Sequence, residues 1–255
     1  MKKADNKKLL YIVSISLILF LAGCVDTGVD NIPTSINYNS QVKIVNLASG
    51  VGTATVTMKD ASGGSISFGQ ISFGSDAPAE GQSYQTIPAG NKTLSISYSS
   101  GGASSLLLTT ESNYKMRIFL IADTSNGKSL IKRTERYIWQ TKSSATDKYL
   151  YPTDTAEVAF FNASPDFTVD TVDVNGKIVV FSNGDTTVFS NLAAKALGLG
   201  DAMGYAKIKA GNYTFNFISN GIKATFSATL SSQGRYTIVI YDKASSLKGK
   251  AFTDD

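Results

Sequence analysis

The sequence of 255 residues has no histidine, a single cysteine, Cys24, and few charged residues, at 17%. Without histidine the chain cannot form a Ser-His-Asp or Cys-His nucleophile system, a His-ligated zinc site or the usual general base of neutral pH. One cysteine excludes disulfides within the chain and metal sites made of cysteine alone. We therefore predict a protein that is not an enzyme and that holds no metal or catalytic cofactor.

The residues that are abundant favour strands and turns, since the chain has 22 Gly, 12 Tyr and 13 Phe. The apolar residues of 94–98 and of 236–240 share one face at a period of two, which predicts strands buried on one side. The dipeptide Asn175-Gly176 between two apolar runs predicts a tight hairpin turn, because both turn positions need positive φ. The composition and these patterns predict an all-β fold.

The sequence contains an internal repeat, which predicts two homologous domains. Three blocks recur in the same order, at offsets of 116, 121 and 122 residues. They pair residues 41–46 with 157–162, 84–94 with 205–215, and 108–114 with 230–236. We place the two domains at residues 40–140 and 156–255. Residues 141–155 are polar, include Pro152 and are predicted to form the linker.

One spacing narrows the fold class. Tyr114 and Tyr236 each lie six residues after a leucine, behind a polar corner and at the start of an apolar strand. This spacing is similar to the tyrosine corner of immunoglobulin-like sandwiches, in which the hydroxyl bonds to the backbone upstream. We predict two tandem immunoglobulin-like antiparallel β-sandwiches, with both tyrosine rings mostly buried and both hydroxyls bonded to the main chain.

The first 24 residues differ from the rest of the chain. Four lysines in residues 1–8 precede an apolar run of 13 residues at 9–21. As a helix this run would be about 20 Å long, which is shorter than the roughly 30 Å hydrocarbon core of a membrane. The pattern predicts a signal helix rather than a spanning anchor.

The run that follows, Leu21-Ala22-Gly23-Cys24, resembles the lipobox of bacterial lipoproteins. The resemblance implies that a signal peptidase recognises Leu21, Ala22 and Gly23 and cleaves before Cys24. It also implies that the Cys24 thiol carries diacylglycerol and that a further acyl chain is added there. More than one acyl chain is needed for stable attachment to a membrane. Residues 1–23 are then the signal peptide, and residues 24–39 are the lipidated cysteine with a flexible tether.

Cleavage would change the charge of the chain. Removing residues 1–23 takes away four lysines and one aspartate, which lowers the formal net charge from +4 to +1. A net charge this small gives no electrostatic reason to expect a nucleic-acid partner. The expected partners are the membrane, through the lipid anchor, and a glycan or protein of the envelope. The expected location is a bacterial cell envelope, on its surface or in the periplasm.

The second repeat resembles the bacterial family known as domain of unknown function 4397. The likeness rests on residues 156–166, which end in Asn162-Ala-Ser-Pro-Asp166, on Val172-Asp-Val-Asn-Gly176 and on residues 205–211. It implies an exported or lipid-anchored β-sandwich in tandem copies, without implying an activity. The first repeat departs from the family pattern, because Asn46-Leu-Ala-Ser-Gly50 stands in the place of the Asn-Ala-Ser-Pro-Asp run.

Two interpretations apply to Asn162, Ser164 and Asp166. The three side chains form a candidate ligand or cation loop. Alternatively, they end the strand in a turn, where short polar side chains bond to backbone N–H groups before Pro165.

The leading hypothesis is a lipid-anchored envelope protein with a non-catalytic binding, adhesion or scaffold role and an unknown ligand. One alternative is an envelope polysaccharide hydrolase, which would need two carboxyl groups roughly 5 to 9.5 Å apart in a cleft. The other is a carbohydrate-binding module, which would need a planar strip of exposed tyrosine or tryptophan side chains.

The lipid anchor is tested by Cys24→Ser. We expect labelled palmitate to enter the wild-type protein and not the variant, because the serine hydroxyl cannot replace the thiol as the attachment atom. Equal labelling of both proteins, or no labelling of the wild type, would contradict the anchor.

Overall fold

The computed structural model describes residues 38–112, 114–123, 130–139, 154–175, 177–178, 197–202 and 205–254. The predicted signal peptide, Cys24, most of the tether and most of the linker lie outside these residues. The described residues form strands and one 3-10 helix, Ala244–Ser246. No helix among them is long and apolar enough to cross a membrane.

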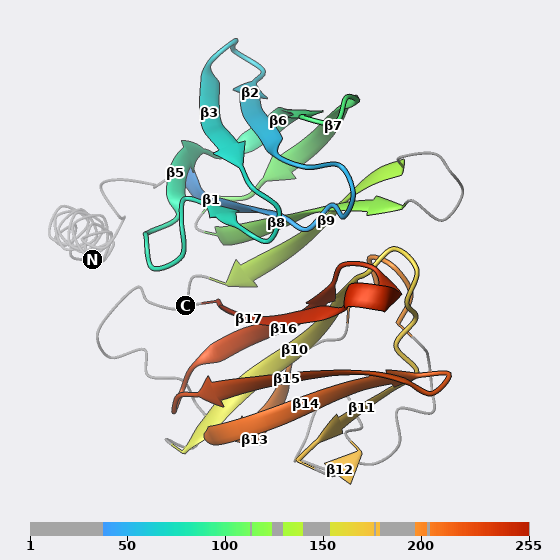
Figure 1. The fold of residues 1–255 in the computed structure, drawn as a ribbon. Helices are drawn as coiled ribbons and strands as arrows, with labels where there is room; N and C mark the ends of the chain where they lie inside the picture. Colours follow the sequence, from blue (N-terminus) through green and yellow to red (C-terminus); the bar gives the residue numbers. More distant parts are fainter. Residues whose placement is uncertain are drawn as a thin grey trace, which may run out of the picture. The chain divides into compact units, whose positions relative to one another are not determined.

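The first half contains two sheets (Figure 1). One has the order β4-β1-β8-β9, with β5 also paired to β1, and the other has the order β3-β2-β6-β7. The strands are β1 (Asn39–Asn46), β2 (Ala54–Asp60), β3 (Ser65–Ile71), β4 (Asp76–Ala77), β5 (Gln85–Pro88), β6 (Gly90–Tyr98), β7 (Ala103–Thr110), β8 (Tyr114–Asp123) and β9 (Leu130–Trp139).

The second half has the same arrangement, with sheets β13-β10-β16-β17 and β12-β11-β14-β15. Its strands are β10 (Thr155–Ala163), β11 (Thr171–Val174), β12 (Lys177–Ile178), β13 (Ala206–Lys209), β14 (Gly211–Ser219), β15 (Ile222–Leu230), β16 (Arg235–Tyr241) and β17 (Lys248–Thr253). The turn between β11 and β12 includes Asn175 at φ 51°, the backbone conformation that the hairpin prediction requires.

The predicted all-β, sandwich-like fold is confirmed, with one difference in strand direction. Most strand pairs are antiparallel, but β1 pairs parallel with β8 and β10 pairs parallel with β16. The first strand of each half meets its partner only after the chain has formed the other sheet. Parallel pairs need such a long connection, so short-range turn signals do not reveal them.

Each half has its own core between its two sheets. The core of the first half includes Val56, Leu94 and Ile118, and that of the second half includes Phe160, Phe217 and Ile238. In β6 the apolar residues alternate with exposed or half-buried polar ones, as a strand with one buried face requires. The outer sheet β3-β2-β6-β7 therefore follows the predicted pattern.

The inner strands are buried on both faces, which corrects the prediction for residues 236–240. Ile238 and Ile240 point into the core of the second half, while Val239 and Tyr241 point the opposite way into a third apolar cluster. This cluster joins the β1-β8 face to the β10-β16 face. Its buried members are Val45, Leu47, Phe119, Ile121, Phe161, Ala163, Val239, Tyr241 and Phe252.

The third cluster, called the junction layer below, makes the two halves one compact unit over residues 38–255. The rings of Phe119 and Phe161 stack across it with centroids 4.7 Å apart. Strands covered on both faces have near-continuous apolar sequences, which explains the run Phe160-Phe161 and the run 238–240. The sequence of sheets is outer, inner, inner, outer, with an apolar layer between each neighbouring pair.

The junction layer is tested by comparing Phe161→Ala with Phe160→Ala. Either change should lower the free energy of unfolding by about 3–5 kcal/mol, because each empties a buried ring site. Only Phe161→Ala should also raise hydrogen exchange in β1 and β8, since Phe161 packs on the first half and Phe160 does not. Unchanged protection of β1 and β8 in Phe161→Ala, measured by mass spectrometry, would contradict this assignment.

Candidate functional site

The side chain of Asn162 is bonded entirely within the fold. Its Nδ2 donates to the carbonyl oxygens of Phe167, at 2.7 Å, and Leu197, at 2.8 Å. Its Oδ1 accepts the Ser164 N–H at 2.9 Å. Asn162 and Ser164 are buried, and Asp166 is exposed and accepts the Ala244 N–H at 2.7 Å. These contacts favour the turn interpretation over the ligand loop.

The same arrangement occurs in the first half, at Asn46. Its Nδ2 donates to the carbonyl oxygens of Gly52 and Ile71, both at 2.9 Å, and its Oδ1 accepts the Ala48 N–H at 3.2 Å. The first half has no Ser-Pro-Asp run after this asparagine. In both halves the asparagine side chain therefore hydrogen-bonds to three separate segments of backbone. This structural role does not depend on the residues that come after the asparagine.

The second tyrosine corner is formed as predicted. Tyr236 is buried, and its hydroxyl accepts the Ser231 N–H at 2.9 Å. A Cβ at Gly234 would lie 2.7 Å from the Tyr236 hydroxyl, so the glycine leaves room for the ring. At the first corner, Tyr114 is half-buried.

A cavity of about 580 Å³ lies where the two halves meet. Its walls come from β1, from β8, from the end of β17 and from residues 78–84, which we call the strap. The lining residues are Gln41, Lys43, Asp76, Glu80, Gly81, Gln82, Ser83, Tyr84, Lys115, Arg117, Phe252 and Thr253. This volume is within the range of about 300–1,000 Å³ that is usual for small-molecule sites.

The position of this pocket follows from the register of β1 and β8. Gln41 pairs with Lys115, Lys43 with Arg117, and Val45 with Phe119. Because side chains alternate between the faces of a strand, residues 41, 43 and 45 point the same way. The face that is apolar at Val45 and Phe119 is thus polar two and four residues earlier on each strand. The pocket continues the junction layer at this polar end.

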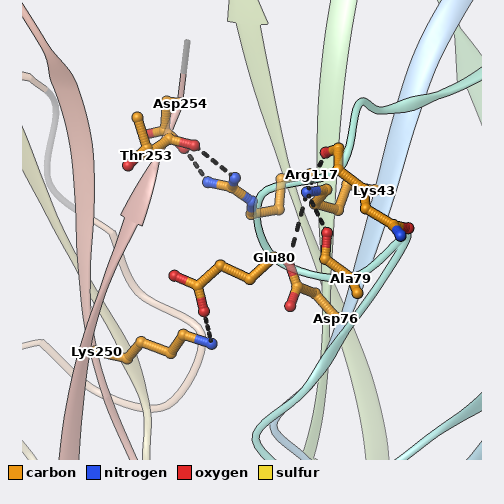
Figure 2. Close-up of polar contacts among 9 residues, drawn as sticks. Lys43, Asp76, Ala79, Glu80, Arg117, Lys250, Thr253 and Asp254 are labelled. Atoms are coloured by element: carbon orange, nitrogen blue, oxygen red, sulfur yellow. Dashed lines mark hydrogen bonds and ion pairs between the residues drawn. The ribbon is translucent and has the colours of Figure 1, made fainter.

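Lys43 fastens the strap to β1. Its ammonium donates to the carbonyl oxygens of Ala79, at 3.3 Å, and Gln82, at 3.0 Å, and lies 3.6 Å from a carboxylate oxygen of Asp76 (Figure 2). Burial lowers the pKa of Lys43, and the Asp76 carboxylate opposes that shift. An ammonium has three protons to donate, so these three contacts account for all of them.

Arg117 and Asp254 form a buried ion pair across the junction (Figure 2). The guanidinium also donates to the Thr253 carbonyl oxygen at 2.8 Å. The second carboxylate oxygen of Asp254 accepts the hydroxyl of Tyr205 at 2.7 Å and that of Thr237 at 2.6 Å. A buried carboxylate is tolerated only with such complete pairing.

Two further contacts cross the junction outside this pair. Lys250 lies 3.0 Å from Glu80 of the strap, as Figure 2 also shows. The Ser49 hydroxyl donates to Asp242 at 2.7 Å. Both contacts are partly exposed, so they hold the position of the loops more than they add to stability.

Three cations surround the ring of Tyr84. Lys43 lies 5.2 Å from its centroid, and Lys115 and Arg117 each lie 5.6 Å from it. Burial raises the pKa of the Tyr84 hydroxyl, and the nearby Arg117 opposes that shift. Among the described residues, neither this hydroxyl nor the Nε of Arg117 has a hydrogen-bond partner.

The two carboxylates that line the pocket, Asp76 and Glu80, are each paired with a lysine. A hydrolase would need one acid that gives a proton and another that attacks or activates water. Within the described ranges, no group of three or more His, Cys, Asp or Glu side chains could hold a metal ion.

Residues 156–255 match the family model of the domain of unknown function DUF4397. The resemblance predicted for the second repeat is thereby confirmed for that segment. The match covers β10 to β17 except for the first residue of β10, and so includes the second-half side of the junction layer. A search of curated proteins gave no match.

Two similar solved structures are provisionally described as cell adhesion proteins. The one from Bacteroides fragilis has 9% sequence identity and a TM-score of 0.23, with 84% of this chain and 97% of that chain covered. The one from Parabacteroides distasonis has 10% identity and a TM-score of 0.23, with 85% and 98% covered.

The buried ion pair is tested by Asp254→Ala. The change should lower the free energy of unfolding by about 3–5 kcal/mol, because it leaves the Arg117 guanidinium buried and unpaired. The double variant Arg117→Met with Asp254→Leu should recover most of this loss, since no buried charge then remains. Chemical denaturation measures both. Equal stability of Asp254→Ala and the wild type would contradict the assignment.

Proposed function

We propose that this protein is a non-catalytic binding protein of a bacterial cell envelope, held at a membrane by lipid on Cys24, and that its ligand occupies the junction pocket. The envelope location and the anchor rest on the N-terminal sequence, in which a short apolar run leads to Leu21-Ala22-Gly23-Cys24. The binding role rests on the pocket.

The main support for the proposal is that both halves contribute residues to the pocket and that several contacts fix the positions of its walls. The junction layer and the Arg117–Asp254 pair fix the walls, and Lys43 fixes the strap. A site whose walls are fixed before the ligand arrives loses little entropy on binding. Rigid walls with paired charges support recognition of a ligand.

The two alternative functions have less support. The hydrolase would need a free carboxyl group, whereas Asp76 and Glu80 are both ion-paired. The carbohydrate-binding module with a planar aromatic strip would need several exposed rings. In the part of the chain whose side chains are described, Tyr38 is the one strongly exposed large aromatic residue.

The proposal is tested by filling the pocket. Ser83 is an exposed strap residue that lines the pocket, so Ser83→Trp should block the pocket without changing the fold. The full chain in detergent is mixed with detergent-washed envelope fragments, and the bound fraction is measured. We expect binding by the wild type and a loss of about tenfold or more in Ser83→Trp, equivalent to at least 1.4 kcal/mol.

The matched control is Ser105→Trp, which adds the same ring at an exposed serine of β7, on the outer sheet and away from the pocket. It should bind as the wild type does. Undiminished binding by Ser83→Trp would exclude the pocket as the site, and no binding by the wild type would contradict the binding role.

A further inference from the structure

We propose that Lys43 and Asp76 form a covalent amide bond in the folded protein, which joins β1 to the strand that leads into the strap. The Lys43 nitrogen attacks the Asp76 carboxyl carbon, and one water molecule is released. This inference goes beyond the proposed function, because the bond forms between residues of the chain and requires no ligand. Three observations support it: the position of the two groups, their isolation from water, and the contacts that hold the amine.

The sheet brings the two side chains together. β4 pairs antiparallel with β1, and Val45 is opposite Asp76. Lys43 lies two residues before Val45 on the same face of β1, so it is the diagonal neighbour of Asp76, which a long side chain can reach. The Lys43 Nζ lies 3.6 Å from a carboxylate oxygen of Asp76, as Figure 2 shows.

Both groups are shielded from water. Each of the two side chains is 6% exposed, and the Tyr84 ring centroid lies 5.2 Å from the Lys43 Nζ. A buried pair of charges carries a desolvation cost that a neutral amine and a neutral acid do not. Burial lowers the pKa of Lys43 against the opposing Asp76 carboxylate, and the Arg117 guanidinium lowers it as well. Transfer of one proton from the ammonium to the carboxylate gives the amine and the acid that amide formation requires.

The other contacts of Lys43 leave its nitrogen aimed at the acid. The carbonyl oxygens of Ala79 and Gln82 accept two of its protons, at 3.3 Å and 3.0 Å. Once the third proton has moved to Asp76, the lone pair that it leaves faces the carboxyl group. Groups held in contact in this way react as if at an effective concentration of about 10⁵ M or more, which favours a bond that would not form between free molecules in water.

Atoms and charges balance in this step. The neutral amine adds to the Cγ of protonated Asp76, and the acid hydroxyl leaves as water with one proton from the nitrogen. The product is a secondary amide whose remaining N–H can still donate to a carbonyl oxygen of the strap. One positive and one negative charge disappear together, so the net charge of the chain is unchanged and no buried charge remains at this position.

Other ion pairs in the described part of the chain lack this combination of burial and a primary amine. The Lys248 side chain is 52% exposed in its pair with Asp242, and the Glu80 side chain is 69% exposed in its pair with Lys250. Water solvates such groups and keeps them charged. The guanidinium of Arg117 is buried, but it stays protonated and is not a nucleophile. The expected site of the bond is therefore the pair on β1 and β4.

The test is the mass of the tryptic peptides. The full chain is purified in detergent, then unfolded and digested, and its peptides are sequenced by tandem mass spectrometry. Asp76 lies between Lys59 and Lys92, so trypsin releases it within residues 60–92. In the wild type we expect this peptide to be joined to Lys43, with no cleavage after Lys43. The branched product should be lighter than its separate parts by about 18 Da, the mass of one water.

Two variants and a matched control assign the bond. Lys43→Arg and Asp76→Ala should each give only linear peptides of full mass, because one reacting group is missing. The control Lys250→Arg, which changes the partner of Glu80 on the strap, should keep the branched peptide.

Linear peptides of full mass from the folded wild type would overturn the proposal, and so would a loss of water located at any other residue. The wild-type digest alone decides between these outcomes, so a variant that fails to fold does not affect the result. Neither outcome bears on the ligand site, which is tested separately by Ser83→Trp.

Discussion

The contact between the two inner sheets governs the rest of the structure. Stacking of Phe119 on Phe161, together with the residues around them, removes from water a face that each half would otherwise expose. Because this contact covers the inner strands on their second face, those strands can carry apolar residues at consecutive positions. The contact also brings the polar ends of β1 and β8 against β17, so the pocket exists only while the two halves are joined.

The same strand faces perform two tasks along their length. On β8, Phe119 and Ile121 belong to the junction layer, and Arg117 and Lys115 of the same face belong to the pocket. Water is excluded at one end, where it would weaken packing, and admitted at the other, where a polar ligand can enter. The Arg117–Asp254 pair lies between the junction layer and the pocket. The charges there are shielded from water, so they need hydrogen-bond and ion-pair partners within the protein.

The sequence was sufficient to predict what depends on local pattern. The alternation in β6 and the positive φ of Asn175 follow from the period of a strand and from the steric limits on a tight hairpin turn, and both are found in the structure. The repeat offset placed Asn46 opposite Asn162, and the two side chains make equivalent bonds. Local sequence could not show that residues 236–240 are buried on both faces, because the second face is covered by residues far away in the chain.

The pocket was not predicted, although a signal for it is present. Lys43 and Arg117 are charged residues within largely apolar strands, a pattern that indicates buried ion pairs. What the sequence does not give is the partner, since Asp254 lies 137 residues from Arg117 and Ala79 lies 36 residues from Lys43. Pairing over such distances is decided by how the sheets pack and not by spacing along the chain.

The separation of Arg117 from Asp254 has a consequence for how the chain is made. The first half is synthesised with an arginine whose carboxylate partner follows 137 residues later, and with an apolar face that packs on residues of the second half. Until then that face resembles an open subunit interface, and it can adhere to other unfinished chains. The interval between the two halves is therefore the period in which a protein of this design most needs protection from aggregation, and joining the halves ends it.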